Sequence, residues 1–242
     1  MSVEPSAPAG SLRPALHAEA LRKTFFAGTP REFAVLRGVS LTVERGRICT
    51  ILGPSGSGKT TLLRCLSGLE SVDSGTVEVG GTKVHELSPR ETQRFRREDI
   101  AFVFQEYNLI SDLTLRENVE LDRPMAARPA ELAARWRLEH VLDHFPDQCS
   151  GGQQQKAAIL RALNRDVDVL FCDEPTGALD GTSAGEVLSV LQEVSANGVT
   201  VVMITHNEMV TEISDRVVRL HDGEVVSDTV VPDPRPAGEL EW

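Results

Sequence analysis

The fold of this chain is decided by one stretch of its sequence, Gly53-Pro54-Ser55-Gly56-Ser57-Gly58-Lys59-Thr60. The residues just before it, Arg47 to Leu52, are mostly apolar and predict a strand that is buried on both faces. A helix is expected to follow, from about Lys59 to Ser67. A glycine-rich loop that joins a buried strand to a helix is typical of a phosphate-binding loop, and this context argues against a chance Gly/Ser turn.

Each residue type in the loop suits the binding of a nucleotide together with a metal ion. Glycines adopt the backbone angles that let successive N–H groups surround a β-phosphate, and the following helix adds the positive end of its dipole. The Lys59 ammonium would neutralise charge on the β- and γ-phosphates. The Thr60 hydroxyl would ligate Mg²⁺, which prefers oxygen ligands. The loop therefore predicts a site for a Mg²⁺-nucleotide, with ATP the expected one.

Outside the loop, short apolar runs alternate with helical patterns and glycine-rich turns, which is typical of an α/β fold. Capping boxes at Ser88 and Thr114 predict the starts of two helices. From Thr114 to about Phe145 the pattern is helical without a strand signal, and we interpret it as an inserted helical subdomain. Other elements are expected at Ser40–Val43, Thr76–Val79, Ile100–Phe104, Val167–Cys172 and Thr200–Ile204 (strands), at Thr182–Ala196 (a helix), and at Arg216–Leu220 and Glu224–Val226 (a hairpin across Asp222-Gly223).

Polar side chains follow three of the expected strands. Asp173 and Glu174 end one, His206 follows Thr205 at the end of another, and Gln105 ends a third. Open α/β sheets bind ligands at the carboxyl ends of their strands, so Asp173 is expected to hold Mg²⁺ and Glu174 to act as general base on water. His206 would contact the γ-phosphate, and Gln105 the metal or the water. A surface turn, a structural histidine and a satisfied loop amide are the alternatives when each is taken singly.

A second phosphate site is predicted at Ser150-Gly151-Gly152-Gln153, which precedes a helical pattern from Gln154 to Leu163. Ser150 is a good N-cap, and two glycines at a helix start leave amides free to face an anion. A head-to-tail dimer explains why one chain has two such sites, because this segment of one subunit would close over the nucleotide of the other. A flexible Gly-Gly loop is the alternative.

The composition narrows the class of protein. Hydrophobic residues make up 40% of the 242, which suits one globular domain with an inserted subdomain or two small lobes, and the net charge of −11 argues against nucleic-acid binding. The arginines between Arg90 and Arg97 fit a solvated helix face better than a basic patch.

The four cysteines, none in a C-x-x-C pair, are expected to be buried and reduced, as in the cytoplasm. We see no secretory signal and no apolar stretch of about 20 residues.

Taken together, these residues resemble the ATP-binding subunit of an ATP-binding-cassette (ABC) transporter over about residues 16–228. The matches occur in the order of the family: Phe25, with Phe26 as the alternative (adenine-stacking aromatic), Gly53 to Thr60 (Walker A), Gln105 (Q-loop), Ser150 to Gln153 (signature), Val169 to Glu174 (Walker B), Gly177 to Asp180 (D-loop) and His206 (switch histidine).

The resemblance implies a P-loop NTPase (RecA-like) α/β core with an antiparallel β subdomain and a helical subdomain inserted at about 107–164. The ATPase domain would span 15–228, between a disordered tail at 1–14 and a flexible tail at 229–242. ATP and Mg²⁺ would be the cofactors, with Thr60, Gln105 and Asp173 at the metal and with Glu174, His206 and Gln105 as catalytic residues. The implied nucleotide contacts are Phe25, Gly53, Pro54, Ser55, Gly56, Ser57, Gly58, Lys59, Thr60, Thr61, Ser150, Gly151, Gly152, Gln153 and Asp180.

The strings at 173–180 and 151–155 look most like the branch with macrolide exporters, lipoprotein-release ATPases and antimicrobial-peptide exporters. This resemblance implies ATP hydrolysis that powers a separate membrane permease from the cytoplasmic face, for export or extraction of a lipid-, peptide- or antibiotic-like substrate. A homodimer is implied, or a heterodimer with a paralogous ATPase. A regulatory or sensing ABC subunit is the alternative, and the acidic charge argues against a DNA- or ribosome-associated ABC protein.

Three features depart from the family pattern. Cys149 stands where the signature usually begins with Leu, and Lys156 stands where Arg is usual. A lysine keeps the positive charge but loses the two-pronged hydrogen bonding of a guanidinium. The stretch from Asn118 to Gln148 is also shorter than usual, which bears on the subdomain that contacts the permease and leaves the catalytic set unchanged.

Overall fold

The computed structural model of the chain describes residues 13–240, and its centre is a six-stranded sheet. Four parallel strands form most of it, in the order β3 (Ile48–Leu52), β8 (Thr200–Thr205), β7 (Val169–Asp173) and β6 (Ile100–Val103). Every residue of β3 and β8 is buried. Parallel strands covered on both faces are expected to be apolar throughout, and this is the pattern from which they were predicted.

Two further strands complete the other edge of this sheet. Strand β9 (Arg216–His221) runs parallel to β3, and β10 (Glu224–Val230) returns antiparallel to β9. Asp222 and Gly223, which join them, have φ angles of 47° and 77°. Positive φ at both central residues is what a two-residue type I′ hairpin requires, so the predicted hairpin is confirmed.

A second, antiparallel sheet has the strand order β2-β1-β4-β5. Its strands are β1 (Leu16–Phe25), β2 (Phe33–Val43), β4 (Ser74–Val79) and β5 (Thr82–Lys83), followed by a short 3-10 turn, η1 (Val84–Glu86). Helix α1 (Lys59–Leu66) lies against both sheets, because its Leu62 and Leu66 share one apolar core with residues of β1, β3 and β8. The antiparallel β subdomain that the resemblance implied is therefore present.

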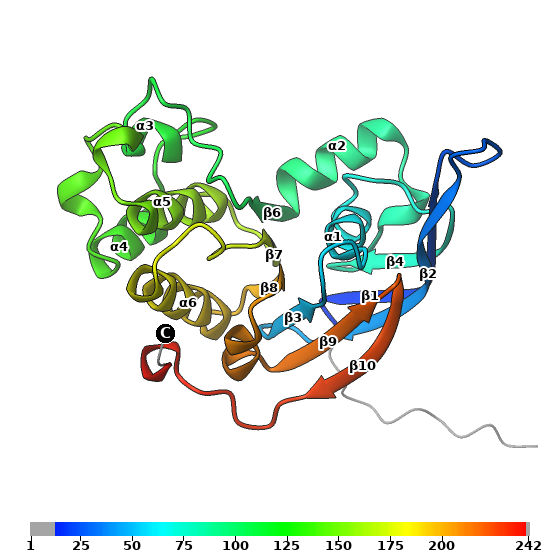
Figure 1. Cartoon of the computed structure of the whole chain (residues 1–242). Helices are drawn as coiled ribbons and strands as arrows, with labels where there is room; N and C mark the ends of the chain where they lie inside the picture. The colour runs from blue at the N-terminus through cyan, green and yellow to red at the C-terminus, as the bar shows by residue number, and fades with distance from the viewer. Residues whose placement is uncertain (1–12, 241–242) are drawn as a thin grey trace, which may run out of the picture.

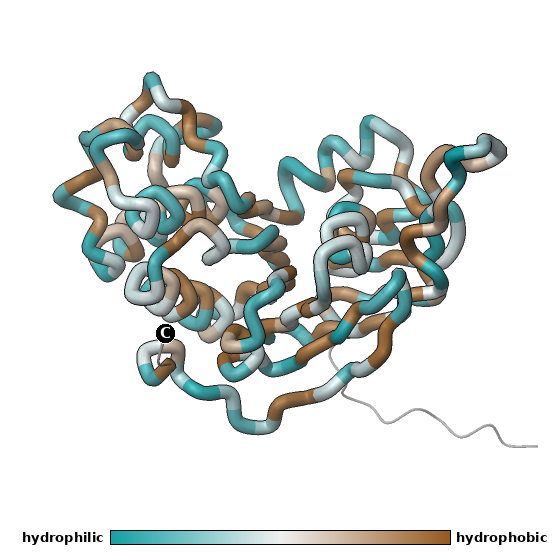
Figure 2. Tube along the Cα trace, in the orientation of Figure 1, coloured by the Kyte–Doolittle hydropathy of each residue, from teal (hydrophilic) through white to brown (hydrophobic). Residues whose placement is uncertain are grey.

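The opposite face of the central sheet is covered by α5 (Gly151–Leu163) and α6 (Gly181–Ala196), as Figure 1 shows. In Figure 2 brown gathers at the centre of the molecule, where β7 and β8 lie, and α2 (Pro89–Glu98) is mostly teal. That helix is the expected solvated one: the capping box at Ser88 starts it, and Arg94 pairs with Glu98 along its surface at 3.1 Å.

The stretch between β6 and α5 contains helices and no strand, as predicted, and stands apart in Figure 1. Its elements are α3 (Leu115–Val119), α4 (Ala127–Arg135) and the 3-10 turns η2 (Glu139–Val141) and η3 (Pro146–Gln148).

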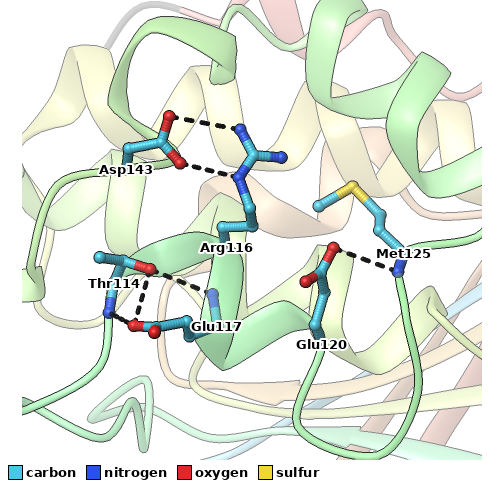
Figure 3. Close-up of polar contacts among 6 residues, drawn as sticks. All are labelled: Thr114, Arg116, Glu117, Glu120, Met125 and Asp143. Carbon is cyan, nitrogen blue, oxygen red and sulfur yellow. Dashed lines mark hydrogen bonds and ion pairs between the residues drawn. The ribbon is translucent and has the colours of Figure 1, made fainter.

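Side-chain contacts hold α3 in place in this short helical region (Figure 3). The Thr114 hydroxyl accepts a hydrogen bond from the Glu117 backbone N–H, and the Glu117 carboxylate accepts one from the Thr114 N–H, which is the predicted capping box. Arg116 donates from Nε to Asp143 at 2.7 Å. A helix this short is not stable alone in water, so the cap at its start and the ion pair to the following segment help to fix it.

The C-terminal stretch differs from the flexible tail expected from residue 229. Strand β10 runs to Val230, and a 3-10 turn, η5 (Ala237–Glu239), then packs on α6, with Ala237 and Leu240 buried. Gln192 of α6 accepts a hydrogen bond from the Ala237 N–H at 2.7 Å. Pro232, Pro234 and Pro236 disfavour a regular helix or strand here, but they do not prevent an irregular chain from docking through two apolar side chains.

Other expectations concern the cysteines and the first residues. All four cysteines are free and buried, as predicted. Burial raises the pKa of the Cys49 and Cys65 thiols to about 12. The disordered tail expected at 1–14 lies outside the described residues except for Arg13 and Pro14, which belong to no helix or strand. No helix within residues 13–240 is long and apolar enough to cross a membrane.

Candidate functional site

The glycines of the loop 53–60 are required, either by their backbone angles or by the close approach of a neighbouring strand. Gly56 and Gly58 have φ angles of 80° and 100°, a region that side chains with a Cβ rarely adopt. A Cβ on Gly53 would collide with the carbonyl oxygen of Leu220. Strand β9 therefore packs closely against the start of the loop. The turn after β9 also contacts the loop, since the Gly223 N–H donates to the Ser57 carbonyl at 3.1 Å.

Two polar side chains of the loop, Lys59 and Ser57, are buried. The buried Lys59 Nζ donates to the carbonyl oxygens of Gly53 and Pro54 at 2.7 and 3.0 Å, and no carboxylate within the described chain forms an ion pair with it. The Ser57 hydroxyl is buried without a hydrogen-bond partner among those residues. Lys59 lines the nucleotide pocket and Ser57 does not, so it is the buried ammonium of Lys59 that suits a phosphate chain.

An open pocket of about 790 Å³ lies in front of the loop. It brings together residues of both sheets and of three strand ends: Phe25, Phe33, Val35, Ser55, Gly56, Gly58, Lys59, Thr60, Thr61, Gln105, Asp173, Glu174 and His206. The three strand-end positions predicted to act jointly therefore do converge. The reason is the parallel sheet, in which β6, β7 and β8 all end at the same edge.

Glu174 is held on both of its carboxylate oxygens. Oε1 lies 3.0 Å from Nδ1 of His206, and Oε2 accepts a hydrogen bond from the Thr205 hydroxyl at 3.1 Å. The backbone of Glu174 has a φ of 48°, in the left-handed region that residues with a Cβ rarely adopt. His206 is mostly exposed at the mouth of the pocket, whereas Glu174 is largely buried. The contact with Thr205 was not anticipated from the sequence, although the pair Thr205-His206 had been noted at the strand end.

Asp173 is half-buried at the end of β7, and its surroundings raise its pKa. Burial is the main cause, and the negative charge of Glu174 adds to it, while Arg64 and Lys59 oppose it. A carboxylate that is costly to keep charged in the absence of a cation is suited to bind one. Within the described chain no group of three His, Cys, Asp or Glu residues could hold a metal ion. Thr60, Asp173 and Gln105 line the same pocket, and each carries an oxygen of the kind that Mg²⁺ prefers.

The aromatic wall of the pocket belongs to the antiparallel sheet. Phe25 lines the pocket, as predicted, whereas the neighbouring Phe26 is 61% exposed and does not line it. Phe33 and Val35 of β2 also line the pocket and were missed in the sequence. Their signal was an apolar pair at alternate positions, which is visible only once β2 is known to begin at Phe33.

The segment Ser150 to Gln153 does not lie in this pocket. It starts α5, where the Ser150 hydroxyl accepts from the Gln153 N–H at 3.3 Å and the Gln153 side chain accepts from the Ser150 N–H at 2.9 Å. The segment faces a different cleft, of about 580 Å³, between α4, α5 and α6. Asp180 is also outside the nucleotide pocket and caps α6 by accepting from the Ser183 N–H at 3.0 Å.

The two residues that depart from the family pattern have clear structural surroundings. Cys149 is buried in the core beneath the start of α5, where its small apolar side chain takes the place of a leucine. Lys156 donates to Glu186 of α6 at 2.6 Å, so it joins the helix of the signature to the helix of the D-loop.

Comparisons with known proteins agree with this geometry. Residues 36–177, more than half of the chain, match the ABC transporter family. The macrolide export ATP-binding/permease protein MacB of Campylobacter jejuni is 42% identical over 206 residues, which are 82% of this chain and 32% of that protein. The MacB protein of Burkholderia pseudomallei is 40% identical over 227 residues, 90% of this chain and 35% of that protein. The chain thus spans about a third of the length of these curated relatives.

A solved structure matches nearly end to end. It is the dimeric ATP-binding cassette MJ0796 in a post-hydrolysis state bound to ADP and Pi, which is 34% identical, with a TM-score of 0.79 and coverage of 90% of this chain and 99% of that one. The phosphate loop between β3 and α1, the converging strand ends and these matches lead to one conclusion: the chain belongs to the ABC transporter family, as an ATP-binding and ATP-hydrolysing cassette.

Proposed function

We propose that this chain powers a membrane permease by ATP hydrolysis, for export or extraction of a lipid-, peptide- or antibiotic-like substrate. The observation that carries the proposal is the single pocket in which the loop 53–60 meets Glu174, His206 and Gln105. The names of the relatives, which are ATP-binding/permease export proteins, support the direction of transport. None of the comparisons favours a regulatory or sensing subunit.

Each residue of the pocket has a separate role in the proposed hydrolysis. The loop amides and Lys59 would hold the phosphates, and Thr60, Asp173 and Gln105 would hold Mg²⁺, which when bound would stabilise negative charge on the phosphoryl oxygens. Glu174 accepts a proton from the attacking water. His206 and Thr205, which contact the two oxygens of Glu174, orient this carboxylate.

Completion of the site requires a second cassette. Ser150, Gly152 and Gln153 line a cleft other than the nucleotide pocket of their own chain, so we infer that the amides at this helix start serve a nucleotide held by another subunit. We propose a head-to-tail dimer in which each segment covers the pocket of the other subunit, with Asp180 beside it. The matched cassette is dimeric, which supports this arrangement.

The permease would position the dimer on the inner face of the cell membrane, and the helical region from α3 to α5 would contact it. This proposal is tested by co-purification from membranes under mild detergent. The chain is expected to bring down a multi-helix membrane protein, and Mg²⁺-ATP hydrolysis should rise when the two are reconstituted in liposomes. Recovery of the chain without any membrane protein, with unchanged ATPase activity in liposomes, would contradict a transport role.

A further inference from the structure

The aromatic end of the nucleotide pocket contains two rings where the family resemblance assigned one. Phe25 of β1 and Phe33 of β2 are paired across the two strands, and their ring centroids are 5.8 Å apart. Both line the pocket, whereas Phe26 does not, although it lies 6.2 Å from Phe33. We propose that Phe33 is a second nucleobase-contacting residue, which forms with Phe25 a two-ring wall for the base of the bound nucleotide. This inference rests on the proposed function of the pocket.

The position of Phe33 relative to the phosphate loop fits the length of a nucleotide. A Cβ on Gly58 would lie 3.0 Å from the Val35 carbonyl oxygen, so the loop touches β2 at Val35. Phe33 lies two residues before Val35 on the same strand, which places the two Cα atoms about 7 Å apart at the usual rise of a strand. A nucleotide whose β-phosphate lies in the loop is long enough to place its base beside Phe33, which lines the same pocket.

The two rings differ in how they are held. Phe25 is supported from its own strand, because the buried Lys23 places its ammonium 5.4 Å from the ring centroid while pairing with Glu70 at 2.7 Å. Phe33 is 53% exposed. The turn before it is ordered by short contacts, with the Gly28 N–H donating to the Glu32 carboxylate at 2.7 Å. A half-exposed ring at a defined position beside a fixed one is apolar surface that a stacked base would cover.

The chemistry of this wall also predicts how the base is recognised. The three residues that β1 and β2 contribute to the pocket, Phe25, Phe33 and Val35, are all apolar. Stacking on aromatic rings accepts every base, because each has a π-face, and hydrogen bonds would be needed to tell adenine from guanine. The wall therefore binds purine bases by contact area, and loss of Phe33 should weaken ADP and GDP binding to the same extent.

The test compares ligands that share a diphosphate and differ in the base. Isothermal titration of the full chain with Mg²⁺-ADP, Mg²⁺-GDP and Mg²⁺-pyrophosphate involves no hydrolysis. Phe33→Ala is expected to raise the Kd of both nucleotides about tenfold, within the range of aromatic–base stacking, and to leave the Kd of pyrophosphate unchanged. Phe33→Tyr should restore nucleotide affinity. Phe26→Ala is the matched control, since it removes a more exposed ring from the same turn and should change none of the three constants.

The outcomes separate this inference from the function on which it rests. A wild-type chain that hydrolyses ATP, with a Phe33→Ala variant that binds ADP as tightly as wild type, would overturn the role of Phe33 alone. If Phe33→Ala weakened pyrophosphate binding as much as ADP binding, the role of Phe33 would also be overturned. The ring would then affect the phosphate loop and not the base. A wild-type chain that binds neither nucleotide would overturn both. Since the Phe33 side chain is half-exposed, its truncation leaves the core intact, and Phe33→Leu provides a second variant without a ring.

Discussion

The two segments with free amides at a helix start, residues 53–60 and 150–153, differ in how far the chain itself satisfies them. In the first, Lys59 contacts only loop carbonyls and the Ser57 hydroxyl has no partner within the described structure. In the second, Ser150 and Gln153 satisfy each other in a capping box. The first segment therefore holds a buried cation that pairs with no acidic side chain of the described chain, whereas in the second the side chains of Ser150 and Gln153 are already paired with each other. The difference is what the proposed dimer predicts, with residues 53–60 holding the nucleotide and residues 150–153 serving a second copy.

The largest expected effect separates ATP hydrolysis from ATP binding in the nucleotide pocket. We expect Glu174→Gln to lower the turnover of Mg²⁺-ATP about 1000-fold, because the amide can accept no proton from water. Nucleotide affinity should remain, and the variant should accumulate as a dimer with ATP, seen by light scattering during gel filtration. Turnover at the wild-type rate would show that Glu174 is not the base.

The second effect concerns the buried cation of the loop. Lys59→Ala is expected to weaken Mg²⁺-ATP binding about 100-fold, since the phosphates would lose a charge that is shielded from water. Equilibrium binding of a fluorescent ATP analogue measures it. Lys83→Ala is the control, because Lys83 pairs with Glu86 on the exposed surface. If both variants bound equally well, the loop would not hold the phosphates through Lys59.

A third change contrasts two identical caps, only one of which faces a cleft beside the proposed dimer surface. Ser150→Ala and Ser88→Ala should each lower the free energy of unfolding by about 1 kcal/mol, because each removes an N-cap hydroxyl. Only the change at Ser150 should lower ATP turnover, and it should leave Mg²⁺-ADP affinity unchanged. Chemical denaturation and phosphate-release assays on both variants test this. Equal effects on turnover would remove the reason to place the segment at the second subunit's nucleotide.

The smallest expected effect concerns the contact that joins α5, the helix that begins at residues 150–153, to α6. Lys156→Ala breaks the contact between α5 and α6, and because Lys156 is nearly buried while Glu186 is exposed, we expect a loss of about 1 kcal/mol in unfolding free energy. Lys156→Arg should keep most of this stability. Urea denaturation measures both, and a Lys156→Ala chain as stable as wild type would mean that other α5–α6 contacts suffice.

Much of the site could be read from the sequence because its parts are local. The loop 53–60, the strand ends at Asp173 and His206 and the caps at Ser88, Thr114 and Ser150 each depend on a few neighbouring residues, and the structure has each element where it was expected. The roles assigned to these residues stay predictions until the variants are measured. What was missed depends on distant contacts: Phe33 pairs with Phe25 across two strands, and Ala237 and Leu240 dock on α6.

The sequence by itself determined the α/β alternation, the phosphate loop and the set of polar residues at strand ends, because short-range patterns dictate strands, helices and turns. Only the tertiary structure decided which of these residues share a pocket. Gln105, Asp173 and His206 meet because three parallel strands end at one edge of the sheet, whereas Ser150 lies on another surface because α5 covers the sheet from the far side. Distances between residues far apart in the chain are set by packing of the sheets and helices, which no local pattern records.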